Sequence, residues 1–400
     1  MKRIVLTAFL LMPVLAFSEP TATTNSEQPS EGVVVATLEE AWRAGGDDDE
    51  VFFGNIGTIK TDGAGVIHML DSQLAEIHRI APDGEHLGTI CKEGDGPGEA
   101  RRPNDMFILS DGTVGVLQQF PGRVILLHPD GTPAGEATFT TESGDKGQFT
   151  VNIRGIAQPN GMALAGIKMS FGAGGVSNQE YFLSQADANG LQTKSLLLKE
   201  HTINYSAFEL DELAMDFVWS RMTQGIEGQV VFAPDRDTME FVVYAADGSQ
   251  VRTFGRPYTV GERTADESSN ARKIIEAVGA NYPTPPQKIT ISDNEAAVSS
   301  LFVTTDGRVW AQPGHRQQDL PEGTWTSFDV YDNEGNFTHV VALPGGFQEG
   351  QDAVYIMPDG RFVVVVGALD AFMNQQAVAG EDEEGEEVAP LEVICYDMSL

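Results

Sequence analysis

The sequence predicts an all-β protein, a six-bladed β-propeller of four-stranded antiparallel blades. The first observation is that Asp-Gly or Asn-Gly pairs recur between β-type runs, at 62–63, 111–112, 160–161, 306–307 and 359–360. A second series of such pairs follows, at 83–84, 130–131, 189–190 and 247–248, with Glu-Gly in the corresponding place at 334–335. These pairs favour two-residue hairpins, because type I′ turns need positive φ. The first two units also align with a period of 49 residues, from Asp62 to Asp111, which is typical of propeller blades.

Six blades can be counted, at about 53–92, 103–142, 150–199, 215–256, 295–343 and 351–400. In the fourth blade, the first turn is expected at Glu227-Gly228. The sixth blade reaches Leu400 after its third strand and lacks a fourth. Residues 32–37 (GVVVAT) form a β-rich segment before the first blade with no partner of their own. We therefore expect this N-terminal strand to close the ring as the outer strand of the sixth blade, which would remove an exposed edge.

One stretch interrupts the repeat between the fourth and fifth blades, at about 257–294. Thr264 and Glu267 have the spacing of a capping box, a helix-compatible run follows, and three prolines come after it. This predicts a short helical insertion within one propeller domain that spans 33–400. An acidic run at 380–387 is expected to be a solvated loop.

The start of the chain has the pattern of a secretory signal peptide. Lys2 and Arg3 precede an apolar run of 14 residues, and small residues stand before a cleavage point near Ser18. The run is shorter than the ~20 residues that span a bilayer, and nothing later is long and apolar enough to do so. We expect residues 1–18 to be removed, residues 19–32 to be a disordered linker, and the mature protein to be periplasmic or secreted.

Charge excludes one class of partner. The chain has 25 Lys and Arg against 59 Asp and Glu, for a net charge of −34. A surface with this much negative charge repels phosphate backbones. Nucleic acid is therefore not an expected partner. Only two cysteines occur, Cys91 and Cys395. The expected strand directions place them toward opposite faces of the ring, so we expect them to stay unpaired.

A Gly-rich motif crosses from the first blade to the second. It consists of Gly94, Gly96, Pro97, Gly98, Glu99 and Pro103, and an Asp-Gly turn and a Pro-Asp-Gly turn follow it. In this the sequence resembles the bacterial exported six-bladed β-propeller proteins of the NHL/TolB-like superfamily. The resemblance implies the propeller fold. Wider relatives include gluconolactonases, paraoxonases and binding propellers, so the resemblance does not select a function.

The predicted topology sorts the loops onto two faces. The Asp-Gly turns lie on one face, which we call the turn face; the loops between second and third strands and between blades lie on the other, the inter-blade face. The long segments fall on the inter-blade face, and function concentrates in variable loops over a rigid scaffold. The candidate ligand-binding residues there are Arg101, Arg102, Asn104, Asp105 and Arg154.

A metal site is the alternative. First strands line the central channel of a propeller, and several begin with oxygen-bearing side chains, which Ca²⁺ or Zn²⁺ could recruit as ligands. The candidate metal ligands are Asn104, Asn152, Asp216 and Asp352. Metal-dependent relatives usually offer a Glu from the first blade, where this chain has Asn55.

Two functions follow from these patterns. The first is a non-enzymatic binding or scaffold propeller without a cofactor, which recognises a glycan, a peptide or a protein partner through its inter-blade face. The alternative is a lactonase or esterase-type hydrolase with one Ca²⁺ or Zn²⁺ ion at the channel mouth. The residues favour the first, because the donor set for the metal is incomplete.

Overall fold

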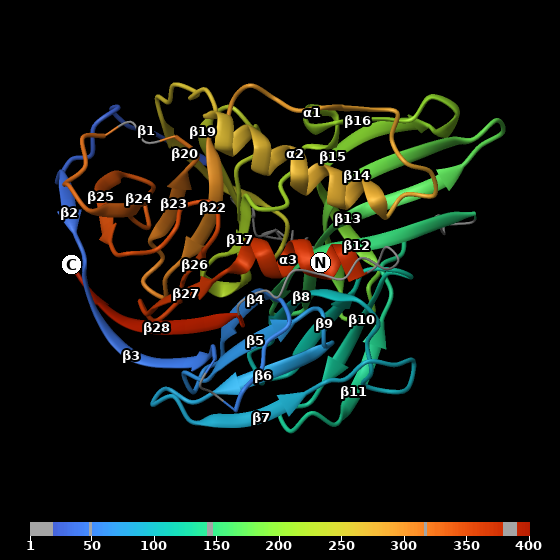
Figure 1. Ribbon diagram of the computed structural model, residues 1–400, viewed down its shortest axis with the longest axis horizontal. Helices are drawn as coiled ribbons and strands as arrows, with labels where there is room; N and C mark the ends of the chain where they lie inside the picture. Colours follow the sequence, from blue (N-terminus) through green and yellow to red (C-terminus); the bar gives the residue numbers. More distant parts are fainter. Residues whose placement is uncertain (1–18, 48–49, 142–146, 316–317, 379–389) are drawn as a thin grey trace, which may run out of the picture.

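The computed structural model describes residues 19–47, 50–141, 147–315, 318–378 and 390–400. Six small sheets surround a common centre, so the predicted six-bladed β-propeller is confirmed (Figure 1). Each blade begins at the middle of the ring and proceeds outward by antiparallel pairing. The expected signal peptide, residues 1–18, and the acidic loop at 380–387 lie outside the described residues. Among the residues that are described, no helix has the length and apolar character needed to cross a membrane.

The first three blades have four strands each and follow the predicted boundaries closely. Their strands are β4 (Ile56–Thr61), β5 (Ile67–Asp71), β6 (Glu76–Ile80), β7 (His86–Ile90), β8 (Pro103–Ile108), β9 (Val114–Gln118), β10 (Arg123–Leu127), β11 (Pro133–Ala137), β12 (Gln148–Gln158), β13 (Gly161–Phe171), β14 (Val176–Asp187) and β15 (Gln192–Asn204).

The strands of the last three blades are β17 (Met222–Gln224), β18 (Val230–Phe232), β19 (Met239–Tyr244), β20 (Gln250–Arg256), β22 (Val298–Val303), β23 (Val309–Pro313), β24 (Thr324–Tyr331), β25 (Phe337–Pro344), β26 (Ala353–Ile356), β27 (Phe362–Val366) and β28 (Glu392–Ser399). Among these three blades, the fourth has the shortest inner strands, with three residues each in β17 and β18. The expected turn at Glu227-Gly228 is present, as the 3₁₀ turn Ile226–Gly228 between β17 and β18.

Hairpins form at the Asp-Gly pairs, but they are not the expected type I′ turns, because Gly112 and Gly131 have positive φ whereas Asp111 and Asp130 do not. Asp111 Oδ1 accepts a hydrogen bond from Thr113 N, and Asp130 Oδ1 accepts one from Thr132 N, each at 2.9 Å. The glycines that follow, Gly112 and Gly131, both have φ of 84°, which costs a residue without a Cβ little. The local sequence thus sets the hairpins, and the hairpins set the topology.

An N-terminal strand closes the ring, but it is not the strand that we expected. The closing strand is β3 (Thr37–Gly45), which pairs antiparallel with β28 in the sixth blade. Half of the expected segment, 32–37, instead forms β2 (Val33–Val35), which lies parallel to β25 on the fifth blade. The apolar pattern of β3 is interrupted by three exposed charged residues, Glu39, Glu40 and Arg43. For this reason the strand could not be recognised from its pattern of apolar residues.

The residues before β2 also differ from the expected disordered linker. Residues Thr21–Thr24 form β1, which lies parallel to β20 on the outer edge of the fourth blade. We call residues 21–35 the N-terminal belt. Asn25 joins the belt to two blades at once, because its Nδ2 donates to Gly255 O and Gly335 O, and its Oδ1 accepts from Phe337 N, all at 2.9 Å.

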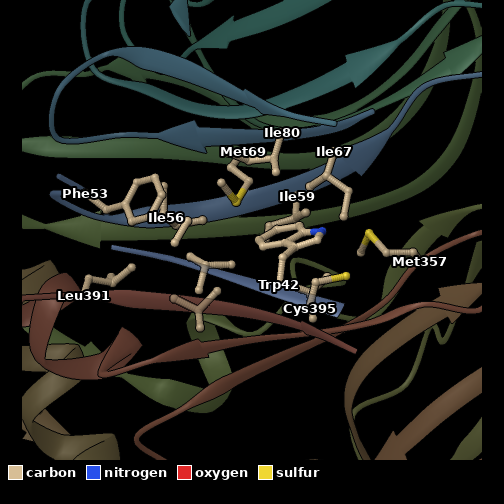
Figure 2. Packing of buried hydrophobic residues seen from close by; sticks show 14 of the residues in the cluster. Trp42, Phe53, Ile56, Ile59, Ile67, Met69, Ile80, Met357, Leu391 and Cys395 are labelled. Carbon is tan, nitrogen blue, oxygen red and sulfur yellow. The ribbon is translucent and has the colours of Figure 1, made fainter. Parts of the chain in front are cut away.

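The closing strand is held by an apolar cluster between the sixth and first blades (Figure 2). Trp42 of β3 is 7% exposed and lies among Ile59 and Met69 of the first blade and Cys395 of β28. Burial of side chains this large is the main favourable term in folding. Cys395 is buried there as a free thiol, and Cys91 is also free, in agreement with the expectation that they do not pair.

The predicted helical insertion is present between the fourth and fifth blades. Helix α2 (Ala265–Ala280) begins with the expected capping box of Thr264 and Glu267. It lies beside a two-stranded parallel sheet of β16 (Glu209–Asp211) and β21 (Lys288–Thr290), and the short helix α1 (Glu212–Met215) follows β16. Glu212 accepts hydrogen bonds from Arg236 and Arg263, which fastens the insertion to the ring.

A further helix, α3 (Ala368–Val378), joins β27 to β28 and was not predicted. It lies over the middle of the ring in Figure 1. Gln375 Oε1 accepts hydrogen bonds from Asn55 Nδ2 and Ser72 Oγ, and Gln376 Oε1 accepts one from Asn281 Nδ2 beyond α2. Both helices therefore belong to the inter-blade face.

Candidate functional site

A cavity of about 830 Å³ occupies the central channel and is lined by the first strand of every blade. These strands are β4, β8, β12, β17, β22 and β26, which surround the middle of the ring in Figure 1. The volume falls in the range of small-ligand sites, roughly 300–1,000 Å³. The channel is therefore the site that the fold itself builds.

Four first strands carry a β-bulge near their inter-blade ends. In β4, β8, β12 and β22 the pairing with the second strand skips one residue: Gly57, Asn104, Ile153 and Ser299, respectively. A bulge turns the side chain that follows it. The residues directly after the four bulges all line the cavity: Thr58, Asp105, Arg154 and Ser300.

Three of these residues form one polar cluster. Asp105, which is 3% exposed, accepts a hydrogen bond from Thr58 Oγ1 at 2.8 Å and one from Gly155 N at 2.8 Å. Arg154 Nη1 lies 3.7 Å from Asp105 Oδ1, and Arg154 Nε donates to Trp219 O at 2.9 Å. Both oxygens of the carboxylate thus accept hydrogen bonds, and the half-buried guanidinium of Arg154 is held between Asp105 and the carbonyl of Trp219.

Lys60 stands two residues after Thr58 on β4, so both side chains lie on the channel side of the strand. Within the described parts of the chain, Lys60 has no hydrogen bond or ion pair. Withdrawal from bulk water lowers the pKa of Lys60; Asp105 opposes this shift and Arg154 adds to it. A half-buried ammonium without a partner is costly, and a bound anion would relieve that cost.

Tyr355 of β26 faces the same cluster from the sixth blade. Its hydroxyl donates a hydrogen bond to Gly57 O at 3.2 Å. Burial raises the pKa of Tyr355, which Arg154 opposes and Asp105 reinforces, so the phenol is neutral at physiological pH. It can therefore act as a hydrogen-bond partner for a ligand, but not as an anion.

The rest of the lining is mixed: aliphatic side chains such as Ile59 and Leu301 lie among hydroxyl, amide and aromatic groups, and Glu227 and Asp352 add carboxylates. Ser300 Oγ donates to Gln312 Oε1 at 2.8 Å, and Gln312 Nε2 donates to Thr326 Oγ1 at 2.9 Å. Trp219 is half-buried in the lining, with its ring held against Phe217 and Tyr181. Such a surface suits a ligand with several hydroxyl groups and one apolar face.

The structure brings together two of the five ligand-binding candidates, Asp105 and Arg154. Arg101 is exposed and pairs with Asp95 at 2.6 Å, as charge alone would suggest. Arg102 is exposed with φ of 47°. Asn104 is an extra residue in a bulge, and its Nδ2 donates to Ile153 O at 2.9 Å rather than lining the channel.

The four candidate metal ligands do not share one site. Asp352 lines the cavity, but its oxygens accept backbone hydrogen bonds from Gly367 N and Gln348 N. Asp216 is paired with Arg221 through both oxygens. Asn152 is fully buried, and Asn104 contacts the neighbouring strand. Among the residues that the structure describes, no group of three or more His, Cys, Asp or Glu side chains could hold a metal ion.

Sequence reasoning missed Lys60, Thr58 and Tyr355. All three lie inside first strands, and the channel candidates were sought at the starts of those strands. One signal was present: Lys60 is the single charged residue in the run FGNIGTIK, which alternates as a buried strand should. A lone lysine at an inward position of a channel strand is itself a site signal.

No family model matches this sequence, and no curated protein matches it. Solved structures resemble it in fold. A DUF4221-family protein from Bacteroides vulgatus is 10% identical, with a TM-score of 0.49 over 91% of this chain and 98% of its own. Regucalcin from Agrobacterium tumefaciens, a calcium-binding protein, is 12% identical, with a TM-score of 0.40 over 91% and 95%. Virginiamycin B lyase from Staphylococcus aureus is 11% identical, with a TM-score of 0.42 over 91% and 99%. At these values the similarities carry nothing about function.

Proposed function

We propose that this protein is an exported binding propeller that takes a small polyhydroxylated acid, such as a sugar acid, into its central channel. The observation that carries the proposal is the ammonium of Lys60, which faces the cavity beside Arg154 without a partner in the described chain. The two cations share the lining with three carboxylates, of which Asp105 and Asp352 accept hydrogen bonds through both oxygens within the protein, so Lys60 and Arg154 are the groups that can bind an anion. The hydroxyl and amide lining suits the rest of a sugar.

The second candidate function is that of a metal-dependent lactonase or esterase. Hard cations need several converging oxygen atoms, and Asp352 is the one candidate ligand in the cavity lining, with both oxygens already engaged. We therefore propose that ligand binding needs no metal ion. Affinity unchanged after treatment with a chelator supports this; loss of affinity that Ca²⁺ or Zn²⁺ restores would return the hydrolase to first place.

The test is a titration of the protein with glucuronate, galacturonate and glucose, followed by calorimetry. We expect the two acids to bind and glucose to bind much more weakly. Lys60→Met should weaken the binding of the acids by roughly 10- to 100-fold, because a hydrogen bond to a charged group contributes about 1.5–3 kcal/mol.

The matched control is Lys273→Met, which removes the same charge from the exposed side of α2. It should leave the affinity unchanged. If glucose binds as tightly as the acids, or if Lys60→Met and Lys273→Met behave alike, the channel does not select its ligand by charge and the proposal is wrong.

A further inference from the structure

The central channel opens at the turn face. Helix α3 lies across its inter-blade end, over the middle of the ring in Figure 1, and hydrogen bonds from Asn55 Nδ2 and Ser72 Oγ to Gln375 Oε1 hold the helix there. Four of the five exposed residues in the cavity lining stand instead at the turn-face ends of first strands: Gln224, Glu227, Thr305 and Pro358. A ligand therefore enters the channel from the turn face.

Two aromatic side chains form part of the channel wall. Phe302 of β22 and Tyr355 of β26 both line the cavity, are half-buried, and have ring centroids 6.1 Å apart in an edge-to-face arrangement. We call these two residues the aromatic pair. Phe302 rests against Phe328 at 6.1 Å, and the Tyr355 hydroxyl donates to Gly57 O at 3.2 Å. Rings held in place in this way lose little entropy when a ligand packs on them.

The aromatic pair lies at the same depth in the channel as Lys60. Phe302 is the second residue after Ser300, and Lys60 is the second residue after Thr58; Ser300 and Thr58 each follow a bulge. Tyr355, whose hydroxyl reaches the strand of Lys60, stands between Phe302 and Lys60 around the ring. A ligand whose anionic group is bound at Lys60 therefore has its remaining atoms beside the aromatic pair.

Apolar side chains continue from the aromatic pair toward the opening. Ile108, Ile226 and Pro358 line the cavity and are half-buried or exposed. Water in contact with such side chains is released when an apolar group covers them, and this release favours binding. The part of the channel nearest the opening therefore suits an apolar group of the ligand.

Charge sets the number and the direction of the anionic groups. Both cations of the lining, Lys60 and Arg154, lie inside the channel, whereas the exposed Glu227 stands at the opening. A carboxylate near the opening would be repelled by Glu227 and by a chain of net charge −34. The ligand therefore has one anionic group, which enters first, and a neutral end at the turn face.

The volume of the cavity points to a ligand with more than one ring. At about 830 Å³ the cavity lies near the upper end of the range for drug-sized ligands. A free sugar acid, with one six-membered ring, fills only a part of this space. The channel thus has room for a second ring beyond the sugar.

We propose that the aromatic pair forms a subsite for an apolar ring, and that the ligand is a monoanionic conjugate, a sugar acid that carries an aryl group on its anomeric oxygen. The carboxylate enters first and binds at Lys60 and Arg154, and the aryl group packs on Phe302 and faces the opening. The carboxylate end of this proposal rests on the proposed function above. The subsite itself rests on the geometry of β22 and β26.

The experiment compares three ligands by calorimetry: glucuronate, phenyl β-glucuronide and the neutral phenyl β-glucoside. We expect the phenyl glucuronide to bind roughly tenfold or more tighter than glucuronate, because the phenyl group covers apolar surface in the channel. The phenyl glucoside, which lacks the carboxylate, should bind much more weakly than the phenyl glucuronide. Lys60→Met should weaken the binding of both acids and leave the ratio between them unchanged.

Phe302→Ala should remove most of the gain that the phenyl group gives and change the affinity for glucuronate little. Phe302→Leu keeps most of the volume packed against Phe328, so it tests the subsite even where the alanine variant fails to fold. It removes the aromatic face and should lower the gain by roughly two- to tenfold. Thermal unfolding of each variant verifies that the fold is kept.

The matched control is Phe347→Ala. Phe347 is also half-buried, but it packs on Trp325, with ring centroids 4.8 Å apart, and does not line the cavity. Its removal should leave the gain from the phenyl group unchanged.

The direction of binding has a test of its own. A resin that carries the phenyl glucuronide, attached through a long spacer on its phenyl ring, should retain the protein, and free phenyl glucuronide should elute it. If the free ligand binds but the resin retains nothing, the aryl group does not face the opening and the proposed orientation is wrong.

The outcomes separate this proposal from the proposed function. If glucuronate binds and depends on Lys60, but the phenyl group adds nothing or its gain survives both substitutions of Phe302, the subsite is wrong and the channel function stands. If the phenyl glucoside binds as tightly as the phenyl glucuronide and both depend on Phe302, selection by charge is wrong and the aromatic subsite stands. If no phenyl conjugate binds, the subsite is overturned.

Discussion

The two halves of the ring solve the problem of exposed strand edges differently. Blades four and five carry an added parallel strand from the N-terminal belt, and blade six takes its outer strand from β3. In the described chain, the outer strands β7, β11 and β15 of blades one to three carry no such addition. The polar cluster of Thr58, Asp105 and Arg154, and Lys60 beside it, lies on the first strands of blades one to three. One half is thus fastened by the chain's own N-terminus, and the other carries both cations of the channel that all six blades line.

Open edges must still be protected from pairing with other chains. In the unbelted half, β11 is five residues long and includes Pro133, which offers no N–H. It also carries Glu136, which pairs with Arg123. Short length, proline and charge are recognised ways to blunt an edge. The belt protects edges in another way, because β1 and β2 pair with the outer strands of blades four and five.

The largest effect is expected where the closing strand enters the core. Trp42→Ala removes a buried indole between blades six and one and should lower the free energy of unfolding by about 3–5 kcal/mol. Chemical denaturation measures it. Arg43→Ala, on the same strand but exposed, is the control and should change the free energy of unfolding much less, because exposed ion pairs contribute little. A loss for Trp42→Ala no greater than for Arg43→Ala would show that β3 does not hold the ring.

An effect of intermediate size is expected in the unbelted half, and it depends on pH. Burial lowers the pKa of His78 to about 4, an effect that Asp71 opposes and His86 reinforces. The unfolded chain takes up this proton near pH 6.5, and the folded protein does so only near pH 4. The stability is therefore intact above pH 6.5 and is lost as the pH falls toward 4, by about 2 kcal/mol between pH 7 and pH 5.

Unfolding experiments at pH 7 and pH 5 on the wild-type protein and His78→Gln measure this effect. The variant should be less sensitive to acid than the wild type, by most of that amount. Equal acid sensitivity in the two proteins would show that His78 is not the group responsible.

The smallest effect is expected in the belt. Asn25→Ala removes three hydrogen bonds between the belt and blades four and five and should lower stability by about 1–2 kcal/mol. Thr21→Ala, whose hydroxyl makes a single long contact of 3.5 Å with Val251 O, is the control. Hydrogen exchange should show faster exchange at β1 and β2 and unchanged exchange in blades one to three. Faster exchange in all six blades alike would contradict a local role for the belt.

The sequence was sufficient for the topology because the hairpin signals are local. Each Asp-Gly pair specifies its own turn, as Asp111 and Asp130 show, and the repeat of turns specifies the blade. The belt could not be predicted in this way, since β1 and β2 pair in parallel with strands that lie far along the chain. A closing strand was correctly expected near the N-terminus, but it was assigned to residues 32–37 instead of Thr37–Gly45.

For the candidate site, Asp105 and Arg154 were identified because they lie near the starts of first strands. Lys60 and Tyr355 were not, although they face the same cavity. The four bulges explain part of the difference, because one extra residue moves every later side chain to the other face of a strand. No residue type specifies a bulge, so inward positions could not be assigned by counting.

The pairing of β3 with β28 also constrains the order of events in folding. Arg43 and Glu392, which form an ion pair across this junction, are 349 residues apart in the chain. A contact between residues this far apart loses loop-closure entropy before any favourable packing forms. A fold that depends on such a contact therefore forms slowly. The closing strand β3 must wait until its partner β28 has been made, 349 residues later in the chain. Until then a nascent chain of this protein lacks its closed ring, and it is in this unclosed form that it meets the rest of the cell.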